Sequence, residues 1–285
     1  MNDQIAEITE QQRKFWNSES ANKWVTNNQS MDRLLAPLTE NLFEIAQVQT
    51  GEAVLDIGCG VGTTTRQVGR TTGPDGRVLG LDISAPMLAA AREKSEAAHV
   101  SFLEADAASH DLSDAAFDLA FSRFGIMFFA EPIVAFTNIR GALTPGGRIA
   151  MACWGPRVDN PWFQMPADIV EKYFGSQPAM PARAPGPTAF GEKNYVEDIL
   201  SNAGFENIQI ETKTIELDAG DELQQAAKYA LFSGPASRAV AQHKPDQDVL
   251  DAMVADVEAR LQPYQTAEGI RISGQVHYLT AVGAG

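Results

Sequence analysis

The chain of 285 residues is long enough for one large domain with insertions or for two small domains, and either can bury a full hydrophobic core. Hydrophobic residues make up 44% and charged residues 21%, a composition that excludes wholesale disorder, collagen-like repeats and a coiled coil. Acidic residues outnumber basic ones 37 to 22, and the formal net charge of -15 repels phosphate backbones and anionic membrane surfaces. We therefore expect no nucleic-acid partner.

The two cysteines, Cys59 and Cys153, lie far apart in the sequence and near no histidine cluster. This spacing indicates neither a disulfide framework nor a metal site, and it fits a reducing compartment. The first fifteen residues hold no apolar run of signal-peptide length, and the longest apolar stretch, 124–130, is too short to span a bilayer. We expect a cytoplasmic protein without membrane insertion.

Residues 1–49 are expected to form a helical cap, because Leu34, Leu38, Leu42 and Ile45 recur at helical spacing. From residue 50 onward, short aliphatic runs alternate with helical stretches, which predicts a parallel sheet covered by helices. Strands are predicted over 53–57, 77–82, 100–104, 117–122 and 148–153. Helices are predicted over 63–69, after an N-cap at Ser84, and over 132–143.

The composition of the sequence changes after the strand predicted over 148–153. Residues 154–193 are interpreted as an inserted substrate cap with at most one helix, over 166–174, because prolines and aromatic residues crowd this stretch. The core is expected to continue over 194–217 and to close with a strand within 269–285, and residues 218–268 read as a second, helical insert. The core itself is assigned to 50–153.

The main candidate for chemistry is the glycine-rich segment 56–62 (DIGCGVG) at the end of the first strand. Glycines at alternate positions let the backbone turn sharply and approach a ligand, and the next helix presents free N–H groups. Asp82 ends the second strand, where a carboxylate can accept hydrogen bonds from both ribose hydroxyls. The pair fits either a dinucleotide or an adenosine-containing methyl donor. The dinucleotide-binding motif G-x-G-x-x-G/A would place glycine or alanine at position 63. The threonine found there favours the methyl donor.

Five ordered segments strengthen that interpretation. They are 54–62 (VLDIGCGVG), 79–84 (LGLDIS), 104–107 (EADA), 117–122 (FDLAFS) and 143–148 (LTPGGR). Together they resemble class I S-adenosylmethionine-dependent methyltransferases, of the small-molecule type found in ubiquinone and menaquinone biosynthesis. The resemblance implies a Rossmann-like, doubly wound α/β fold, in which a seven-stranded sheet is mostly parallel with an antiparallel last strand and helical caps are inserted. It also implies S-adenosylmethionine as the methyl donor.

The resemblance implies contacts with the two ends of the donor. Gly58, Cys59 and Gly60 are expected near its methionine end, with Asp56 supporting the loop or reaching the amino group. Ser122, after strand four, is expected near the same end.

For the adenosine end, the resemblance places Asp82 on the ribose and packs Ile83 and Met87 on the adenine. Asp106 is expected to accept from the exocyclic amine, and the N–H of Ala107 to meet a ring nitrogen. A tight turn, solvated strand ends and ordinary core packing are the structural alternatives for these positions.

The residues predicted to bind the methyl acceptor are indicated by weaker sequence signals than those predicted to bind the donor. Arg123 follows strand four and is a candidate substrate contact, unless it only bridges to a carboxylate. The tryptophans fall in the N-terminal segment or just after strand five, and they either wall the acceptor pocket or pack the caps on the core: Trp16, Trp24, Trp154 and Trp162. No feature selects a catalytic base, although His110 and His243 are candidates.

The sequence therefore predicts an enzyme that moves a methyl group to an oxygen, nitrogen, sulfur or carbon nucleophile of a small organic acceptor. One alternative is a regulatory protein that binds the donor without turnover, and a more distant one is a nicotinamide-dependent oxidoreductase. The acceptor and the methylated atom are not selected by any motif. An oligomer is compatible with the sequence, but no feature indicates one.

Overall fold

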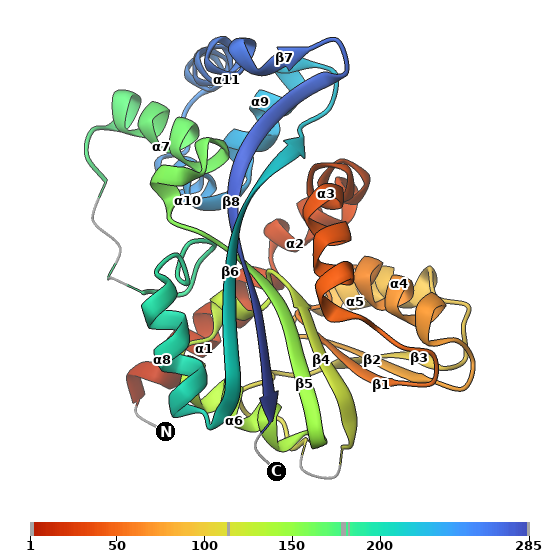
Figure 1. Ribbon diagram of the computed structural model, residues 1–285. Helices are drawn as coiled ribbons and strands as arrows, with labels where there is room; N and C mark the ends of the chain where they lie inside the picture. The colour runs from red at the N-terminus through yellow and green to blue at the C-terminus, as the bar shows by residue number, and fades with distance from the viewer. Residues whose placement is uncertain (1–2, 113–114, 178–180, 182, 284–285) are drawn as a thin grey trace.

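The computed structural model describes residues 3–112, 115–177, 181 and 183–283 (Figure 1). Its central sheet has the strand order β3-β2-β1-β4-β5-β8-β6. The strands are β1 (Ala53–Ile57), β2 (Arg77–Asp82), β3 (Val100–Glu104), β4 (Phe117–Arg123), β5 (Leu143–Trp154), β6 (Phe205–Asp218) and β8 (Gly269–Gly283). Only β8 runs antiparallel to its neighbours, β5 and β6, so the predicted fold class is confirmed. A short strand that the sequence did not suggest, β7 (Gln265–Thr266), pairs with the start of β8.

The sheet places the glycine loop at the point where its strand order reverses. β1 pairs in parallel with β2 on one side and with β4 on the other. The carboxyl ends of these strands therefore meet at one edge, and a ligand of an open α/β sheet binds in the crevice at such a point. Ile57, Asp82 and Arg123 end the three strands.

Helices surround the sheet (Figure 1). Those that precede or cover the core are α1 (Asp3–Trp16), α2 (Glu19–Thr26), α3 (Asn28–Ala46), α4 (Thr63–Thr72), α5 (Ala85–Glu93), α6 (Pro132–Gly141) and α8 (Lys193–Asn202). Three single-turn 3₁₀ segments span Ile126–Phe128, Arg157–Asp159 and Gln262–Tyr264. The predicted cap of α5 is present, because the Ser84 hydroxyl accepts from the N–H of Met87 at 3.4 Å.

The other helices stand beyond the carboxyl edge of the core. They are α7 (Pro161–Phe174), α9 (Leu223–Phe232), α10 (Gly234–His243) and α11 (Gln247–Leu261). β6 and β8 extend past their neighbours and carry α9 and α11 (Figure 1). α7 packs against α9, α10 and α11, so the two predicted inserts meet in one helical layer. The domain boundaries themselves stay a prediction, and residues 1–2, 113–114, 178–180, 182 and 284–285 of that division lie outside the described residues.

The one helix predicted within 154–193 begins earlier than expected. It was predicted over 166–174, and α7 begins at Pro161. Proline suits the first helical position, where the missing N–H has no partner within the helix. Pro161 therefore starts α7 and does not break it, which makes the helix longer than predicted.

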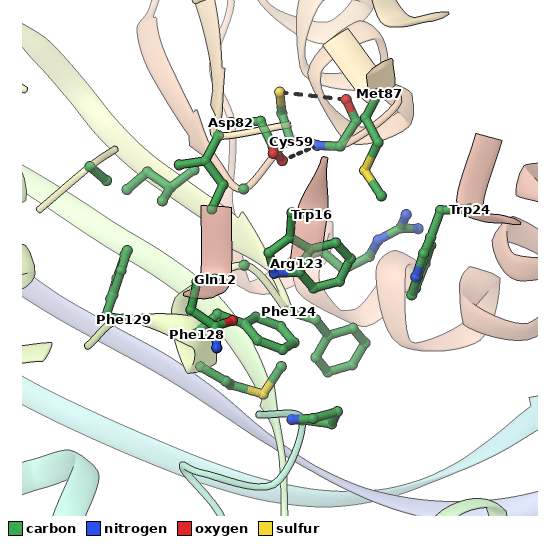
Figure 2. Close-up of a pocket in the computed structure, with 18 of the residues that line it drawn as sticks. Gln12, Trp16, Trp24, Cys59, Asp82, Met87, Arg123, Phe124, Phe128 and Phe129 are labelled. Atoms are coloured by element: carbon green, nitrogen blue, oxygen red, sulfur yellow. Dashed lines mark hydrogen bonds between the residues drawn. The ribbon is translucent and has the colours of Figure 1, made fainter. Parts of the chain in front are cut away.

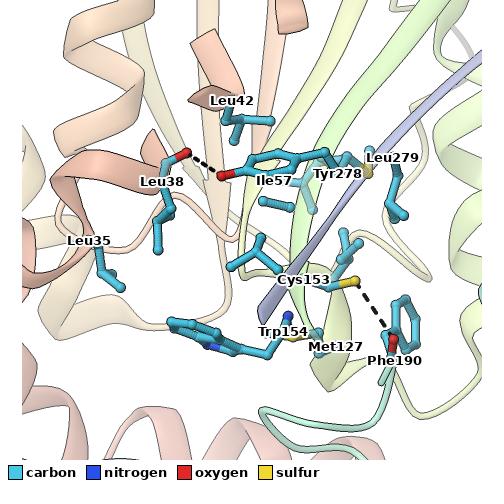
Figure 3. Close-up of a cluster of buried hydrophobic side chains, with 14 of the residues drawn as sticks. Leu35, Leu38, Leu42, Ile57, Met127, Cys153, Trp154, Phe190, Tyr278 and Leu279 are labelled. Carbon is cyan, nitrogen blue, oxygen red and sulfur yellow. Dashed lines mark hydrogen bonds between the residues drawn. The ribbon is translucent and has the colours of Figure 1, made fainter. Parts of the chain in front are cut away.

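The helix α3 is fixed on the sheet by a buried apolar cluster (Figure 3). Leu35, Leu38 and Leu42 are nearly or fully buried against the sheet. The Tyr278 hydroxyl on β8 donates to the carbonyl of Leu38 at 3.0 Å. This packing determines where the first turns of α3, which carry Asp32, lie at the carboxyl edge of the sheet.

None of the helices in the described part of the chain is both long and apolar enough to cross a membrane.

Candidate functional site

The glycine loop turns sharply between β1 and α4. Gly58, Gly60 and Gly62 have φ angles of 65°, 54° and 74°, in the region that favours glycine. The Asp82 carboxylate accepts from the N–H of Gly60 at 2.8 Å and from the N–H of Ser84 at 2.9 Å. Asp82 thus joins the loop to the start of α5.

Buried hydrogen bonds of Asp56 and Ser122 hold the two ends of this loop in place. The Asp56 Oδ2 accepts from the hydroxyls of Thr64 and Thr65 at 2.8 and 2.6 Å. The Ser122 hydroxyl donates to the carbonyl of Ile57 at 2.7 Å and accepts from the N–H of Gly125 at 3.2 Å. Both side chains are buried and neither lines the cavity above the loop. For Asp56 this position matches the loop-supporting role that was one of its two predicted alternatives, and Ser122 likewise holds the loop beneath the cavity.

Burial raises the pKa of Asp56 to about 6, although the hydroxyls of Thr65 and Thr64 lower it in part. The unfolded chain protonates this carboxyl near 3.8. The folded state therefore holds the proton more tightly, and the stability this provides is complete below pH 3.8 and is lost as the pH rises through 6.

We expect Asp56→Asn to remove that pH dependence. Between pH 4 and pH 7 the unfolding free energy of the wild type should fall by about 2 kcal/mol relative to that of the variant. Urea denaturation of both proteins at the two pH values measures the difference. A stability gap that stays constant over this range would contradict the buried, proton-binding Asp56.

A cavity opens next to the loop, and it is lined by all but two of the residues predicted for the site. On the donor side the lining residues are Gly58, Cys59, Gly60, Asp82, Ile83, Met87, Asp106 and Ala107. On the acceptor side they are Trp16, Trp24, Arg123, Trp154 and Trp162. The structure therefore brings together segments from both ends of the predicted core and from the caps.

The two ends of the cavity differ in chemistry. Figure 2 shows Asp82, Cys59 and Met87 at one end and Phe124, Phe128 and Phe129 at the other. At the apolar end Phe124 stacks on Trp154, with ring centroids 4.3 Å apart and planes 4° from parallel. Edge contacts join Trp16 to Phe128 and Trp154 to Phe163, each at 5.1 Å. A polar end beside an aromatic chamber suits a ligand with a sugar and a base next to an apolar reactant.

The N-terminal helices close one wall of the cavity. The Asn17 side chain, directly after α1, donates to the carbonyl of Ile83 at 2.9 Å and accepts from the N–H of Ala85 at 2.9 Å. This pair of hydrogen bonds fixes the end of α1 beside Asp82 and so holds Trp16 over the cavity.

An ion pair lies at the carboxyl edge of β4. The Arg123 guanidinium donates from Nη2 to the Asp32 carboxylate at 3.1 Å and from Nη1 to the Thr39 hydroxyl at 3.0 Å. The Thr63 hydroxyl, at the start of α4, donates to the second Asp32 oxygen at 2.8 Å. Both charged residues line the cavity. Arg123 therefore bridges to a carboxylate, as one of its predicted alternatives required, and also faces the ligand space.

Sequence reasoning missed several lining residues. These are chiefly Ile5, Thr9, Gln12, Arg13, Asn28, Met31 and Asp32 from the N-terminal helices, and Phe124, Phe128 and Phe129 after β4. The aromatic run after β4 could have been found, because polar and aromatic residues that follow a strand of this sheet face the ligand edge. No sequence signal marked Asp32, which α3 brings to the site through tertiary packing.

The described residues give little support for a cysteine or histidine nucleophile or for a bound metal ion at this site. Burial raises the pKa of the Cys59 thiol, with Asp82 and Asp56 adding to the effect, so a reactive thiolate is disfavoured. His277 is buried, with its ring nitrogens bonded to Thr212 and to the carbonyl of Gly191. Within residues 3–283, leaving out the undescribed gaps, no cluster of histidine, cysteine and carboxylate side chains could hold a metal ion.

Comparisons with known proteins indicate the class of protein that this chain resembles. Residues 55–151 match the family model described as a methyltransferase domain. This part of the chain is thus similar to a methyltransferase domain, and the predicted resemblance to S-adenosylmethionine-dependent methyltransferases is confirmed.

Among the curated relatives is the ubiquinone/menaquinone biosynthesis C-methyltransferase of Pseudomonas paraeruginosa, 37% identical over 111 residues, which are 38% of this chain and 43% of the relative. The aklanonic acid methyltransferase of a Streptomyces species is 30% identical over 131 residues, covering 44% of this chain and 60% of the relative. The match thus spans less than half the length of the first of these relatives.

Among solved structures, the phosphoethanolamine N-methyltransferase 2 of Haemonchus contortus, in complex with phosphomonomethylethanolamine and S-adenosylhomocysteine, has a TM-score of 0.53 and 23% identity. The alignment covers 90% of this chain and 53% of that one. This likeness shows a shared fold.

Proposed function

We propose that this protein is an S-adenosylmethionine-dependent methyltransferase that acts on a small organic acceptor. The observation that carries the proposal is one cavity in which the glycine loop and Asp82 stand beside an aromatic chamber at the carboxyl edge of the sheet. The names of the matched relatives, which include a ubiquinone/menaquinone biosynthesis C-methyltransferase and an aklanonic acid methyltransferase, support the same reaction class.

The residues present fit the adenosine part of the donor. Asp82 would accept hydrogen bonds from the ribose hydroxyls, and Ile83 and Met87 would pack against the base. Asp106 and the backbone of Ala107 would recognise the adenine edge. Since Asp82 already holds the N–H of Gly60, ribose binding and loop geometry depend on the same carboxylate.

The glycine loop would hold the methionine end of the donor. The backbone of Gly58, Cys59 and Gly60 lines the cavity there, next to the first turn of α4. The donor supplies a methyl group on a positively charged sulfur, which is already activated for displacement. The task left to the chain is to orient the acceptor and to exclude water, and orientation of this kind contributes about 7 to 11 kcal/mol to lowering a barrier.

The acceptor would lie in the aromatic chamber. Trp154, Phe124 and Phe128 offer ring faces and edges that suit a flat, apolar molecule, and such faces also stabilise a nearby cation by about 0.5 to 2 kcal/mol. Among the described residues that line the cavity there is no histidine, lysine or tyrosine, and neither His110 nor His243 reaches it. We infer that the acceptor loses its proton to solvent or to a lining carboxylate such as Glu131, or is nucleophilic without a base.

The partner and the location remain part of the proposal. The acceptor is a small molecule, because the cavity is enclosed by caps on several sides, and the charge of -15 disfavours nucleic acid. The reduced cysteines, buried and unpaired, are consistent with a cytoplasmic location.

Calorimetric titration with S-adenosylmethionine, S-adenosylhomocysteine and NADH tests the donor. We expect micromolar binding of the first two ligands and none of the third. Selective NADH binding would replace the proposal with an oxidoreductase. Turnover is then tested with a panel of aromatic acceptors by mass spectrometry, and donor binding without any product would favour a regulatory protein.

A further inference from the structure

We propose that the ion pair between Asp32 and Arg123 recognises the charged amino-acid end of the donor, with Arg123 on its carboxylate and Asp32 on its ammonium group. The inference rests on the proposed function and adds a residue from α3 to the donor site. It assigns a role to Asp32, which no motif of the sequence suggested.

The first argument is position. Arg123 ends β4 and Asp32 lies on α3, and both line the cavity. Their side chains are 14% and 27% exposed, so they face the ligand space while most of their surface is covered. The Thr63 hydroxyl ties Asp32 to the first residue of α4, the helix that follows the glycine loop. The pair thus stands directly beside the place where the methionine end is expected.

The second argument is charge. The described partners of the Arg123 guanidinium use two of its five N–H donors. The remaining donors, with the free N–H groups at the start of α4, suit a carboxylate. Asp32 supplies the opposite charge for an ammonium group. A zwitterion placed on this pair leaves none of the four charges uncompensated, which is the condition for binding charges away from water at a small penalty.

The third argument is the position of Asp56. This carboxylate is only 1% exposed and does not line the cavity, and it holds the hydroxyls of Thr64 and Thr65. It therefore does not meet an ammonium group in the cavity. Four carboxylates line the cavity in the described part of the chain: Asp82 and Asp106 belong to the adenosine end, Glu131 follows the aromatic run after β4, and Asp32 is tied by Thr63 to the start of α4.

The test compares two ligands that differ in the amino-acid end. S-adenosylhomocysteine carries it, and 5′-methylthioadenosine keeps the nucleoside and the thioether without it. The variants are Asp32→Asn and Arg123→Gln, each titrated with both ligands. The matched control is Arg33→Gln, since Arg33 lies next to Asp32 on α3 but pairs with Asp218 and Asp221 outside the cavity.

We expect each site variant to bind S-adenosylhomocysteine about 10- to 100-fold more weakly, the scale of a lost charged hydrogen bond, and to bind 5′-methylthioadenosine within about twofold of wild type. The control should match wild type for both ligands. Equal weakening of both ligands would mean that the pair only fixes α3 on the sheet and would overturn the inference. Unchanged S-adenosylhomocysteine binding would also overturn it, and Arg123 would then be free for the acceptor.

A second test of the inference uses the wild-type protein alone and varies the ligand. An analogue of S-adenosylhomocysteine without its carboxylate should bind at least about 10-fold more weakly than S-adenosylhomocysteine itself. Equal affinity contradicts recognition of the carboxylate. If the wild type binds 5′-methylthioadenosine and S-adenosylhomocysteine equally well, the inference fails while the donor site stands. If it binds neither, the proposed function itself fails and takes the inference with it.

Discussion

Gly58→Ala is expected to lower the free energy of unfolding by about 2 to 5 kcal/mol and to abolish donor binding. Two effects combine. The φ of 65° disfavours any residue with a Cβ by about 1 to 2 kcal/mol. A Cβ at this position would also lie 2.5 Å from the Cα of Gly125, a backbone atom that cannot move aside, and such overpacking costs about 1 to 3 kcal/mol more. Urea denaturation measures the loss.

The control for this prediction is Gly146→Ala in the turn within β5. Gly146 has a φ of 81°, and an added Cβ there would meet no atom within 4 Å. That variant should lose only the backbone part, about 1 to 2 kcal/mol. If the two variants lose the same stability, then the close approach of Gly58 and Gly125 does not constrain the loop.

Asp82→Ala is expected to weaken binding of S-adenosylhomocysteine by about 1.5 to 3 kcal/mol, or roughly 10- to 150-fold. The carboxylate would lose its bonds to the ribose, and the N–H groups of Gly60 and Ser84 would lose the acceptor that holds the loop to α5. Burial raises the pKa of Asp82, and the backbone N–H groups of Gly60, Ser84 and Ile83 oppose that shift, so these bonds help keep the carboxylate charged.

The matched control is Glu104→Ala. Glu104 is the register partner of Asp82 on β3, and its exposed side chain does not line the cavity. Calorimetry should find its donor affinity unchanged. Thermal melting of both variants separates a loss of contact from a loss of folded protein. Equal affinity for Asp82→Ala and wild type would refute the ribose assignment.

The donor side of the site could be predicted because its determinants are local in sequence. An aliphatic strand, glycines at alternate positions and a carboxylate at the end of the next strand each follow from short-range backbone preferences. The right-handed parallel connection then brings the ends of β1 and β2 together, so Gly60 and Asp82 become hydrogen-bond partners although 22 positions separate them.

Which way an individual side chain points was harder to predict from the sequence than where the strands and the glycine loop lie. Asp56 and Ser122 lie in strands buried on both faces, where alternation carries no signal for which side faces the ligand. The structure directs both toward the loop and the start of α4, where the Thr64 and Thr65 hydroxyls donate to one Asp56 oxygen and the Ser122 hydroxyl donates to the carbonyl of Ile57. Both residues therefore support the loop in the structure, which is one of the two roles predicted for Asp56.

By itself, the sequence determined the class of fold, the strand boundaries near the glycine loop and most residues at the polar end of the cavity, because these depend on periodicity and on turn chemistry within a few residues. Only the tertiary structure decided which residues of the N-terminal helices reach the cavity. Asp32 meets Arg123 because α3 packs its leucines on the sheet and Tyr278 anchors the carbonyl of Leu38. Contacts of this kind join positions far apart in the chain, and no local pattern of residues encodes them.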